Sequence, residues 1–566
     1  MIPGKTKQPL LDVQDLTIRF NSDGAERCAV DHVSFTLAGS ETLAMVGESG
    51  SGKTVSALAL LRLIPSPPGR ISAGRIQFRT REGNVMDLMA LNEKAMQQVR
   101  GTRISMIFQE PMTSLNPVFT CGSQVAESLE VHMRFTKKEA RERVIGLFGE
   151  VMLPRPEWTF KAYPHQLSGG QKQRVMIAMA IACNPDLLIA DEPTTALDVT
   201  VQKTILDLLK KLQQARGMGI LFITHDLGIV RGFADRVAVM SNGRIVEQGT
   251  TGDIFSKPAH PYTRGLLACR PLLTQRPASL PTVEQYLAGE NASASPVTAG
   301  QRKKEHERLY ASEPALLVSK LSKKFGSFTA LEETSFKVYP GETLGIVGES
   351  GSGKTTLARV ILELIPPTEG KVIYKGRDIT RVTGVMLKEM RKELQIIFQD
   401  PYSSLNPRLT AGRAIGEPMK VHRLHEDETA RRERVMELLH MVGLKPEHYD
   451  RYPHEFSGGQ RQRVCIARAL AVEPRLIICD ESVSALDVSI QAQVLNLLND
   501  LKRNLGLTYI FISHDLSVVK YMSDRLIVMN KGRIEEMGEA DAIYSNPRSE
   551  YTRRLLEAIP GGQADR

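Results

Sequence analysis

Short, mostly apolar runs along this chain end at glycine or acidic residues, as buried parallel strands do. Residues 42–46 (TLAMV) form one such run and lead into a glycine-rich stretch, and residues 54–63 continue with apolar positions at helical spacing. Residues 187–190 form another run, which ends at Asp191. A buried parallel strand would present that carboxylate at the carboxyl edge of its sheet. The pattern predicts an α/β fold with a mainly parallel sheet.

The same pattern recurs in the second half, where the apolar run 476–479 ends at Asp480. Between the halves, residues 270–313 lose this periodicity, and they include a small, polar stretch followed by a charged one. This composition predicts a linker with room for one short helix. The expected organisation is a first domain at 8–270, a linker at 271–313 and a second domain at 314–560.

Length and composition agree with two soluble domains. A chain of 566 residues is too long for one hydrophobic core, and its 42% apolar and 24% charged content is ordinary for globular proteins. We find no apolar run near the roughly 18–20 residues that a spanning helix needs, and the first residues do not resemble a signal peptide. We therefore expect a protein that is neither secreted nor membrane-spanning by itself.

Net charge and cysteine content do little to narrow the range of possible functions. The net charge of +9 suits an anionic membrane surface or a nucleic acid, but also a solvated surface with neither role. The six cysteines lie far apart without a CxxC spacing, which argues against a disulfide framework or a cysteine metal site and suits a reducing cytosol.

The strongest chemical signal is a glycine-rich octapeptide, GESGSGKT, that occurs twice and fits the phosphate-loop pattern G-x-x-x-x-G-K-[ST]. In such loops backbone N–H groups surround an anion, the lysine reaches the terminal phosphates and the threonine hydroxyl holds Mg²⁺. Two identical copies indicate a duplicated nucleotide-binding unit. The residues predicted to bind nucleotide here are Gly47, Glu48, Ser49, Gly50, Ser51, Gly52, Lys53 and Thr54, with Gly348, Glu349, Ser350, Gly351, Ser352, Gly353, Lys354, Thr355 and Thr356 in the second copy.

Further landmarks follow each loop in the same order. The SGGQ glutamine precedes the acidic Asp by 20 residues in both copies, and that Asp precedes a histidine by 34 residues in both. Only the distance from the loop lysine to a following glutamine differs, at 56 and 45 residues. We expect the additional residues of the first copy to form a surface loop near residues 80–92.

The duplicated polar residues fit the parts of a phosphate-transfer site. Asp191 and Asp480 would complete a Mg²⁺ site with Thr54 and Thr355, and the adjacent Glu192 and Glu481 would act as general bases toward water. Gln109 and Gln399 would contact Mg²⁺ or water, and His225 and His514 would hydrogen-bond the γ-phosphate. Any one of these residues alone has a structural explanation, but their repetition at matching positions favours function.

Two Ser-Gly-Gly-Gln segments, Ser168, Gly169, Gly170, Gln171 and Ser457, Gly458, Gly459, Gln460, come directly before stretches with helical spacing. The N–H groups and dipole at a helix start favour an anion. Each domain already has one phosphate loop. A second anion site at a helix start makes sense if it closes over the ATP of another domain.

This set of motifs resembles the ABC-type ATPases over essentially both halves. The resemblance implies two tandem P-loop (RecA-like) nucleotide-binding domains, each with a helical subdomain, that pack head to tail around two ATP molecules. Each site would then join the phosphate loop, Gln, Asp-Glu and His of one half to the SGGQ segment of the other. Phe20 and Phe325 precede the loops where the family places an adenine-stacking aromatic ring, and core packing is their alternative role.

The second half departs from the family pattern at Phe456, where leucine is usual, and at Ser482, where the first half has Pro193. Neither change removes a phosphate or metal ligand, so we expect two hydrolytic sites. The strings at 109–117 and 399–407, together with HPYTR at 260–264 and SEYTR at 549–553, resemble the dipeptide, oligopeptide and nickel importer ATPases. The fused arrangement is similar to the glutathione and microcin-type peptide importers.

The resemblance also implies partners. Two membrane permeases would dock on residues 118–166 and 408–455, a solute-binding protein would supply substrate, and the chain would lie at the cytoplasmic face of the inner membrane without nucleic acid. Only Cys269 follows the HPYTR string, so we expect no iron–sulfur cluster. The alternative is a soluble tandem ABC ATPase acting on ribosomes or DNA, which the absence of spanning segments and the basic charge permit.

Overall fold

The computed structural model describes residues 8–22, 25–109, 114–195, 197–290, 296–425, 427–484 and 486–559. Contacts divide the chain into two compact units. The first comprises residues 1–197, 201–267 and 286–289, and the second comprises residues 198–200, 268–285 and 290–566. Each unit carries one copy of the repeated landmarks.

The first unit contains two sheets. A six-stranded sheet has the order β10(Arg244–Thr250), β9(Arg236–Ser241), β3(Thr42–Val46), β8(Gly219–Thr224), β7(Leu187–Asp191) and β6(Ile104–Ile107), and all its pairs are parallel except β10 with β9. An antiparallel sheet has the order β2(Ala25–Leu37), β1(Leu11–Ser22), β4(Gly69–Arg79) and β5(Val85–Asp87). Every residue of β3, β7 and β8 is buried, which explains their continuous apolar runs.

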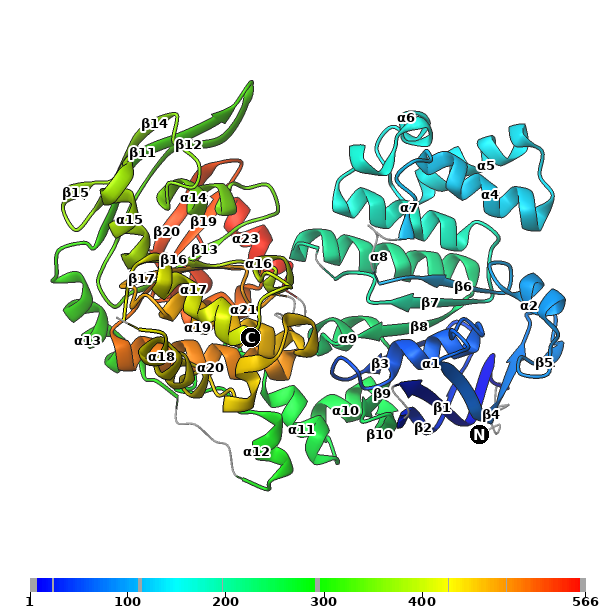
Figure 1. Cartoon of the computed structure of the whole chain (residues 1–566). Coiled ribbons are helices and arrows are strands. Elements are labelled where there is room, and N and C mark those ends of the chain that lie inside the picture. The colour runs from blue at the N-terminus through cyan, green and yellow to red at the C-terminus, as the bar shows by residue number, and fades with distance from the viewer. Residues whose placement is uncertain are drawn as a thin grey trace. The chain divides into compact units, whose positions relative to one another are not determined.

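Four helices of the first unit form a group of their own (Figure 1). The group α4, α5, α6 and α7 packs together as a helical subdomain beyond the six-stranded sheet. The bounds of these and the remaining helices are α1(Lys53–Leu60), α2(Glu93–Val99), α4(Cys121–Met133), α5(Lys137–Glu150), α6(Pro156–Lys161), α7(Gly169–Ile181), α8(Val199–Arg216), α9(Leu227–Phe233), α10(Thr251–Ser256) and α11(Pro261–Ala268).

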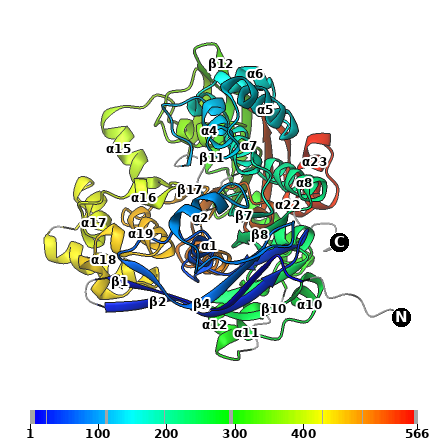
Figure 2. The same cartoon turned by 90° about the vertical axis from the view of Figure 1, so that its right-hand side faces the viewer.

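The second unit repeats this architecture. Its six-stranded sheet has the order β16(Leu394–Ile397), β17(Leu476–Asp480), β18(Thr508–Ile512), β13(Thr343–Val347), β19(Arg525–Asn530) and β20(Arg533–Glu539), and its antiparallel sheet has the order β12(Phe328–Val338), β11(Leu316–Phe325), β14(Glu369–Tyr374) and β15(Arg377–Asp378). Figure 2 shows α17, α18 and α19 grouped as α4, α5 and α7 are in the first unit. The helices are α14(Lys354–Ile361), α15(Gly384–Glu393), α16(Pro401–Ser404), α17(Ala411–Val421), α18(Glu428–Met441), α19(Gly458–Leu470), α20(Val488–Leu505), α21(Leu516–Met522), α22(Ala540–Ser545) and α23(Glu550–Glu557).

The additional residues of the first copy lie in two places, not only near residues 80–92. Phe78 pairs with Leu11 as Tyr374 pairs with Leu316, so Phe78 and Tyr374 are equivalent positions. Counted from the loop lysines, about half of the additional residues therefore come before Phe78. Most of the rest lengthens the turn between β4 and β5. The sequence pattern could not place the first part, because it lies in the segment that leads into a strand and in the strand itself.

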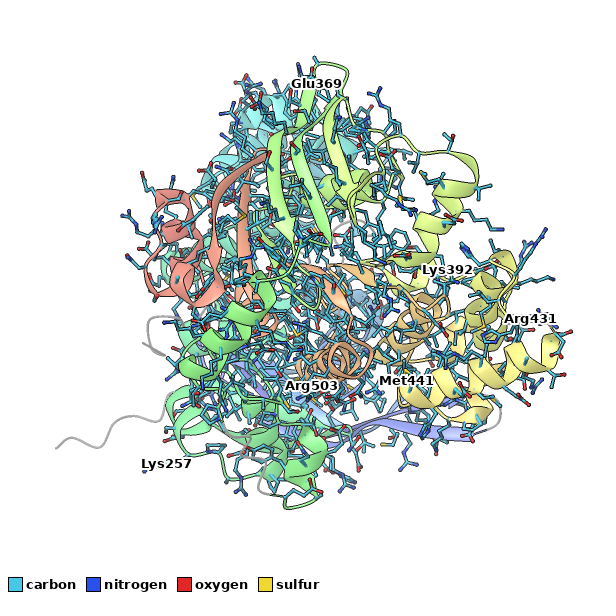
Figure 3. All side chains as sticks on the ribbon, turned by 90° about the vertical axis from the view of Figure 1, so that its left-hand side faces the viewer. Lys257, Glu369, Lys392, Arg431, Met441 and Arg503 are labelled. Atoms are coloured by element: carbon cyan, nitrogen blue, oxygen red, sulfur yellow. The ribbon has the colours of Figure 1, made fainter. Side chains whose placement is uncertain are left out.

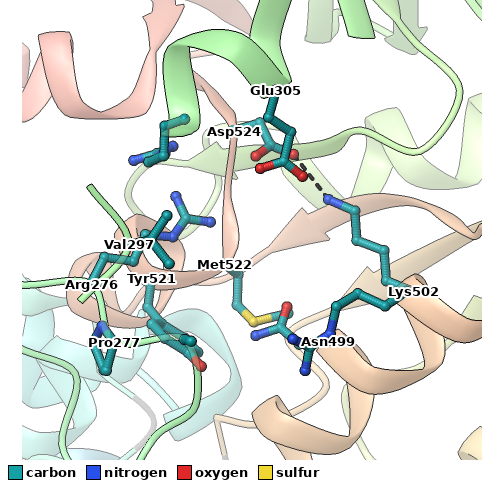
Figure 4. Close-up of a pocket in the computed structure, with 12 residues that line it drawn as sticks. Arg276, Pro277, Val297, Glu305, Asn499, Lys502, Tyr521, Met522 and Asp524 are labelled. Atoms are coloured by element: carbon teal, nitrogen blue, oxygen red, sulfur yellow. Dashed lines mark hydrogen bonds and ion pairs between the residues drawn. The ribbon is translucent and has the colours of Figure 1, made fainter. Parts of the chain in front are cut away.

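The segment expected as a linker holds two helices, α12(Val283–Leu287) and α13(Ala299–Tyr310). Arg302 and His306 of α13 are buried, and Arg302 donates to the Ser523 carbonyl and pairs with Asp541. Together with Arg276 and Lys502, Arg302 lines a cavity of about 150 Å³ beside α13 (Figure 4). Much of this segment is therefore docked on the second unit.

Candidate active site

The first phosphate loop is shaped by positions that only glycine fits. Gly47 has a φ of 152°, and a Cβ there would lie 2.2 Å from the Met240 carbonyl oxygen. Gly52 has a φ of 102°, caps the start of α1, and would place a Cβ 2.6 Å from the Ala29 carbonyl. A side chain at either position would displace the loop backbone, so the glycines allow the tight approach that phosphate loops need.

Lysine and tyrosine side chains hold this loop from two sides. The buried Lys53 ammonium donates to the carbonyls of Gly47 and Glu48, both at 2.8 Å. The Glu48 N–H donates to the hydroxyl of Tyr262, on α11, at 3.2 Å. Because few waters compete at this buried site, the Lys53 ammonium would interact strongly with an anion there.

The second loop has the same geometry. Gly348 has a φ of 154° and Gly353 one of 104°, and Lys354 donates to the carbonyls of Gly348 and Glu349 at 2.7 and 2.9 Å. Burial lowers the pKa of Lys354, although nearby carboxylates oppose this effect. The Glu349 N–H donates to the Tyr551 hydroxyl at 3.2 Å.

A threonine–aspartate pair lies beside each loop. Thr54 donates to Asp191 Oδ1 at 3.2 Å, and Thr355 donates to Asp480 Oδ1 at 3.1 Å. Asp191 ends β7 and is buried; this burial raises its pKa to about 6, with the Thr54 hydrogen bond opposing the shift. Burial likewise raises the pKa of Asp480. A nearby cation would stabilise the ionised form of each carboxyl.

The donor set suits Mg²⁺. Hydroxyl, carboxylate and amide oxygens are the ligands that this ion prefers, with water and phosphate oxygens completing its shell. Within the described ranges no three His, Cys, Asp or Glu side chains gather as a protein-only metal site would require. The pair of Thr and Asp instead fits an ion that is shared with a bound nucleotide.

A glutamate next to the aspartate is the centre of a second cluster. Glu192 is buried, has a φ of 46°, and accepts from Gln109 Nε2 at 3.1 Å and from Thr195 Oγ1 at 2.9 Å. His225 Nδ1 lies 2.9 Å from the other carboxylate oxygen. Burial raises the pKa of Glu192, but the hydrogen bond and charge of His225 more than offset it and lower the pKa below its usual value.

The second unit repeats the cluster at Glu481, whose φ is 49°. Gln399 Nε2 donates to Glu481 Oε2 at 2.8 Å, and His514 Nδ1 lies 3.2 Å from the same oxygen. Despite burial, the hydrogen bond to Glu481 raises the pKa of His514, and the same contact lowers the pKa of Glu481. The structure thus brings Gln, Glu and His together in each unit.

The two SGGQ segments start helices. Ser168 caps α7 and Ser457 caps α19, and each forms a reciprocal capping box with its glutamine. The N–H groups of the first turn, with the helix dipole, give each segment the electrostatic character of an anion site.

The two aromatic candidates differ in their surroundings. Phe20 is partly buried and packs against the core of the first unit, and a Cβ on Gly69 would lie 2.8 Å from its ring. Phe325 is 49% exposed, with the Lys323 ammonium 5.0 Å from its ring centroid. Phe325 has the freer ring face for stacking, and core packing explains Phe20 without a ligand.

Sequence reasoning missed the roles of three residues in these contacts. Tyr262 and Tyr551 belong to strings that we used only for family resemblance, yet their hydroxyls contact the phosphate loops. Thr195, which donates to Glu192, has a polar counterpart at Ser484, so the repeat could have identified this position as a candidate site residue. Part of the 109–117 string, residues 110–113, lies outside the described residues.

Two units that each combine a phosphate loop, a Thr–Asp pair and a Gln–Glu–His cluster define a tandem P-loop ATPase. The ABC transporter family matches residues 30–195 and 331–484, and the oligopeptide/dipeptide transporter C-terminal region matches residues 246–294 and 536–565. The chain therefore belongs to the ABC transporter family. It is an ATPase coupled to transport. The family matches confirm the resemblance, the fold class and the enzyme class expected from the sequence.

Curated relatives match nearly the whole chain. It is 48% identical to the glutathione import ATP-binding protein GsiA of Salmonella choleraesuis (strain SC-B67), over 97% of this chain and 89% of that protein. It is also 48% identical to GsiA of Escherichia coli (strain K12), over 98% of this chain and 90% of that protein. A solved dimeric bacterial ABC transporter cassette is 31% identical, covers 40% of this chain and 98% of its own, and has a TM-score of 0.37.

Hydropathy adds one finding on membranes. None of the helices in the described part of the chain is both long enough and apolar enough to cross a bilayer.

Proposed function

We propose that this chain binds and hydrolyses two ATP molecules to energise an importer of short peptides or related small solutes. The observation that carries the proposal is the Gln–Glu–His cluster beside a phosphate loop and a Thr–Asp pair, present in both units. The import of peptide-like solutes is supported by the oligopeptide/dipeptide region in each half and by the names of the relatives.

Each glutamate would act as the general base. Its lowered pKa keeps Glu192 ionised near neutral pH, so that its carboxylate accepts a proton from water as that water attacks the γ-phosphate. His225 orients this carboxylate and has a second ring nitrogen for the γ-phosphate. Glu481 and His514 would do the same in the second unit.

The remaining residues would bind and position the substrate. Lys53 and Lys354 would neutralise phosphate charge while the loop N–H groups hold the phosphate oxygens. Thr54, Asp191 and the Gln109 side-chain oxygen would hold Mg²⁺, as would Thr355, Asp480 and Gln399. When bound, Mg²⁺ would neutralise charge that develops on the phosphates. The Gln109 amide nitrogen donates to Glu192, so its oxygen is the atom left for a metal or water.

Each ATP site would be completed by the other domain. Ser457–Gln460 would close over the ATP bound at Lys53, and Ser168–Gln171 over the ATP at Lys354. The helix starts at these segments supply the N–H groups and dipole that a γ-phosphate requires. Binding of ATP would close the domains and hydrolysis would reopen them.

The partners would be two membrane permeases, contacted by the helical subdomains within residues 118–166 and 408–455, and a solute-binding protein would deliver the solute. The chain would then lie at the cytoplasmic face of the membrane. Exposed apolar side chains in the first of these regions, including Val118, Phe119 and Val131, support a docking role.

Reconstitution with the candidate permeases tests the proposal. In proteoliposomes we expect uptake of a short peptide such as glutathione that requires ATP and the solute-binding protein. An ATPase that hydrolyses ATP but co-purifies with ribosomes and never drives uptake would contradict the transport assignment.

A further inference from the structure

A second cavity, of about 270 Å³, lies in the second unit at the end of α20. Its walls come from α18, from the end of α19 and the segment after it, and from the residues around the end of α20. Figure 3 labels Met441, which lines this cavity from the last position of α18. None of the residues that we assign to ATP binding lines it.

The floor of this cavity is apolar, and its lining also holds two cations, Arg434 and Arg475, and the carboxylate of Glu473. Leu438, Leu470 and Leu507 are almost fully buried, and Leu505 is 38% exposed. Arg434 Nη1 contacts Glu437 at 2.8 Å and Nη2 contacts Glu473 at 3.6 Å, but its buried Nε has no hydrogen-bond partner. Arg475, the other cation of the lining, is exposed.

In the first unit the equivalent positions carry charged side chains that pair with one another. Arg216 ends the 18-residue α8 as Leu505 ends the 18-residue α20, and Glu150 ends α5 as Met441 ends α18. The Arg216 guanidinium donates to the Ile181 carbonyl at 2.9 Å and pairs with Glu150 at 2.5 Å. Glu150 also pairs with Arg143, the counterpart of Arg434, at 3.0 Å.

The second unit lacks this ion-pair network, because Leu505 and Met441 replace an arginine and a glutamate. Leucine is shorter than arginine, and methionine cannot accept the guanidinium hydrogen bonds that glutamate accepts. The second unit has a cavity beside Leu505 and Met441, and the buried Nε of Arg434 has no acceptor there, which is uncommon for a buried donor. A ligand that fits must be apolar at one end and carry hydrogen-bond acceptors at the other.

We propose that this cavity binds a small amphipathic carboxylate, such as a medium-chain fatty acid. The alkyl tail would pack on Leu438, Leu470 and Leu507, and the carboxylate would accept charge-assisted hydrogen bonds from Arg434 and Arg475. The cavity is larger than the roughly 150 Å³ that holds benzene in an apolar protein core. The site is separate from ATP binding, so it stands whether or not the proposed transport function holds.

Calorimetric titration of the whole chain with sodium octanoate tests this site, and octylammonium serves as the probe with the opposite charge. We expect one octanoate per chain, weaker binding of octylammonium, and affinity that rises up to about fourfold per methylene from butyrate to octanoate. Absence of octanoate binding at millimolar concentration, or equal binding of both probes, would overturn the proposal.

The sister unit supplies the variants. Leu505→Arg with Met441→Glu should place an Arg–Glu pair like that of the first unit in the cavity and lower octanoate affinity at least about tenfold. Arg216→Leu with Glu150→Met should open the first unit and add a second binding site. Leu505→Phe closes the cavity without adding charge, so it serves if the double variant does not fold. Unchanged binding in a closing variant that retains normal ATPase activity would show that octanoate binds elsewhere.

Discussion

At the residue scale, the central contact is the glutamate that follows the strand-ending aspartate. Glu192 meets a glutamine 83 residues earlier and a histidine 33 residues later, and both approach its carboxylate within hydrogen-bond distance. Repetition in the sequence was enough to select these residues as candidates. It could not show that glutamine and histidine converge on the glutamate, because that depends on the sheet order that brings β6, β7 and β8 together.

Gly47→Ala tests the shape of the first loop. Because the new Cβ would meet the Met240 carbonyl at 2.2 Å, we expect a loss of about 1–3 kcal/mol in unfolding free energy and loss of ATP binding at that loop. Gly83→Ala is the control, since Gly83 also has a positive φ but has open space around it and lies outside the phosphate loop. Urea unfolding and binding of a fluorescent ATP analogue measure both effects, and equal behaviour of the two variants would refute this explanation.

The tyrosine contact predicts a smaller effect on the same loop. Tyr262→Phe removes the hydroxyl that accepts from the Glu48 N–H, so we expect ATP affinity to fall about fivefold with little change in folding. Tyr551→Phe should act likewise on the second loop. Tyr163→Phe, at an exposed ring, is the control. An ATP affinity unchanged in both variants would show that the contact does not position the loop.

At the scale of elements, the buried parallel strands and the helices after the phosphate loops were predictable from periodicity alone. The docking of α13 was not, because Ala299–Tyr310 is mostly polar and its buried side chains are Arg302 and His306. These polar groups are buried because acidic groups of the second unit pair with them. A hydrophobic pattern carries no signal of that kind.

The position of His306 predicts a pH dependence. Its nitrogens lie 3.7 Å from Asp524 and 3.5 Å from Glu539; Asp524 raises the pKa of His306, while burial and the Arg302 charge oppose the shift. A raised folded-state pKa adds stability that is fully present below the unfolded pKa, near 6.5, and is lost as pH rises through the folded pKa. Wild type should therefore lose its advantage over His306→Gln as pH rises from below to above about 6.5.

Urea midpoints of both proteins across this range measure the effect, and Lys304→Gln, an exposed charge change on the same helix, is the control. A stability difference between wild type and His306→Gln that stays constant with pH would mean that His306 does not titrate in this contact.

At the scale of the whole molecule, duplication explains most of what the sequence revealed. Each unit repeats the order of strands, the Thr–Asp pair and the Gln–Glu–His cluster. The departures at Phe456 and Ser482 leave Thr355, Asp480 and Glu481 in these contacts. The two units differ away from the site, for example at Leu505. The consequence of that difference can be seen only from contacts in the folded structure. The account therefore predicts two working hydrolytic sites.

Steady-state ATPase activity of the full chain, with Glu192→Gln and Glu481→Gln made separately, tests this claim most directly. Each change keeps the shape of the side chain but removes the general base, so we expect either variant to lose at least about tenfold in activity. Equal ATP affinity in the variants and wild type would confirm that only hydrolysis is affected. Full activity in either variant would contradict the claim that both units carry out hydrolysis.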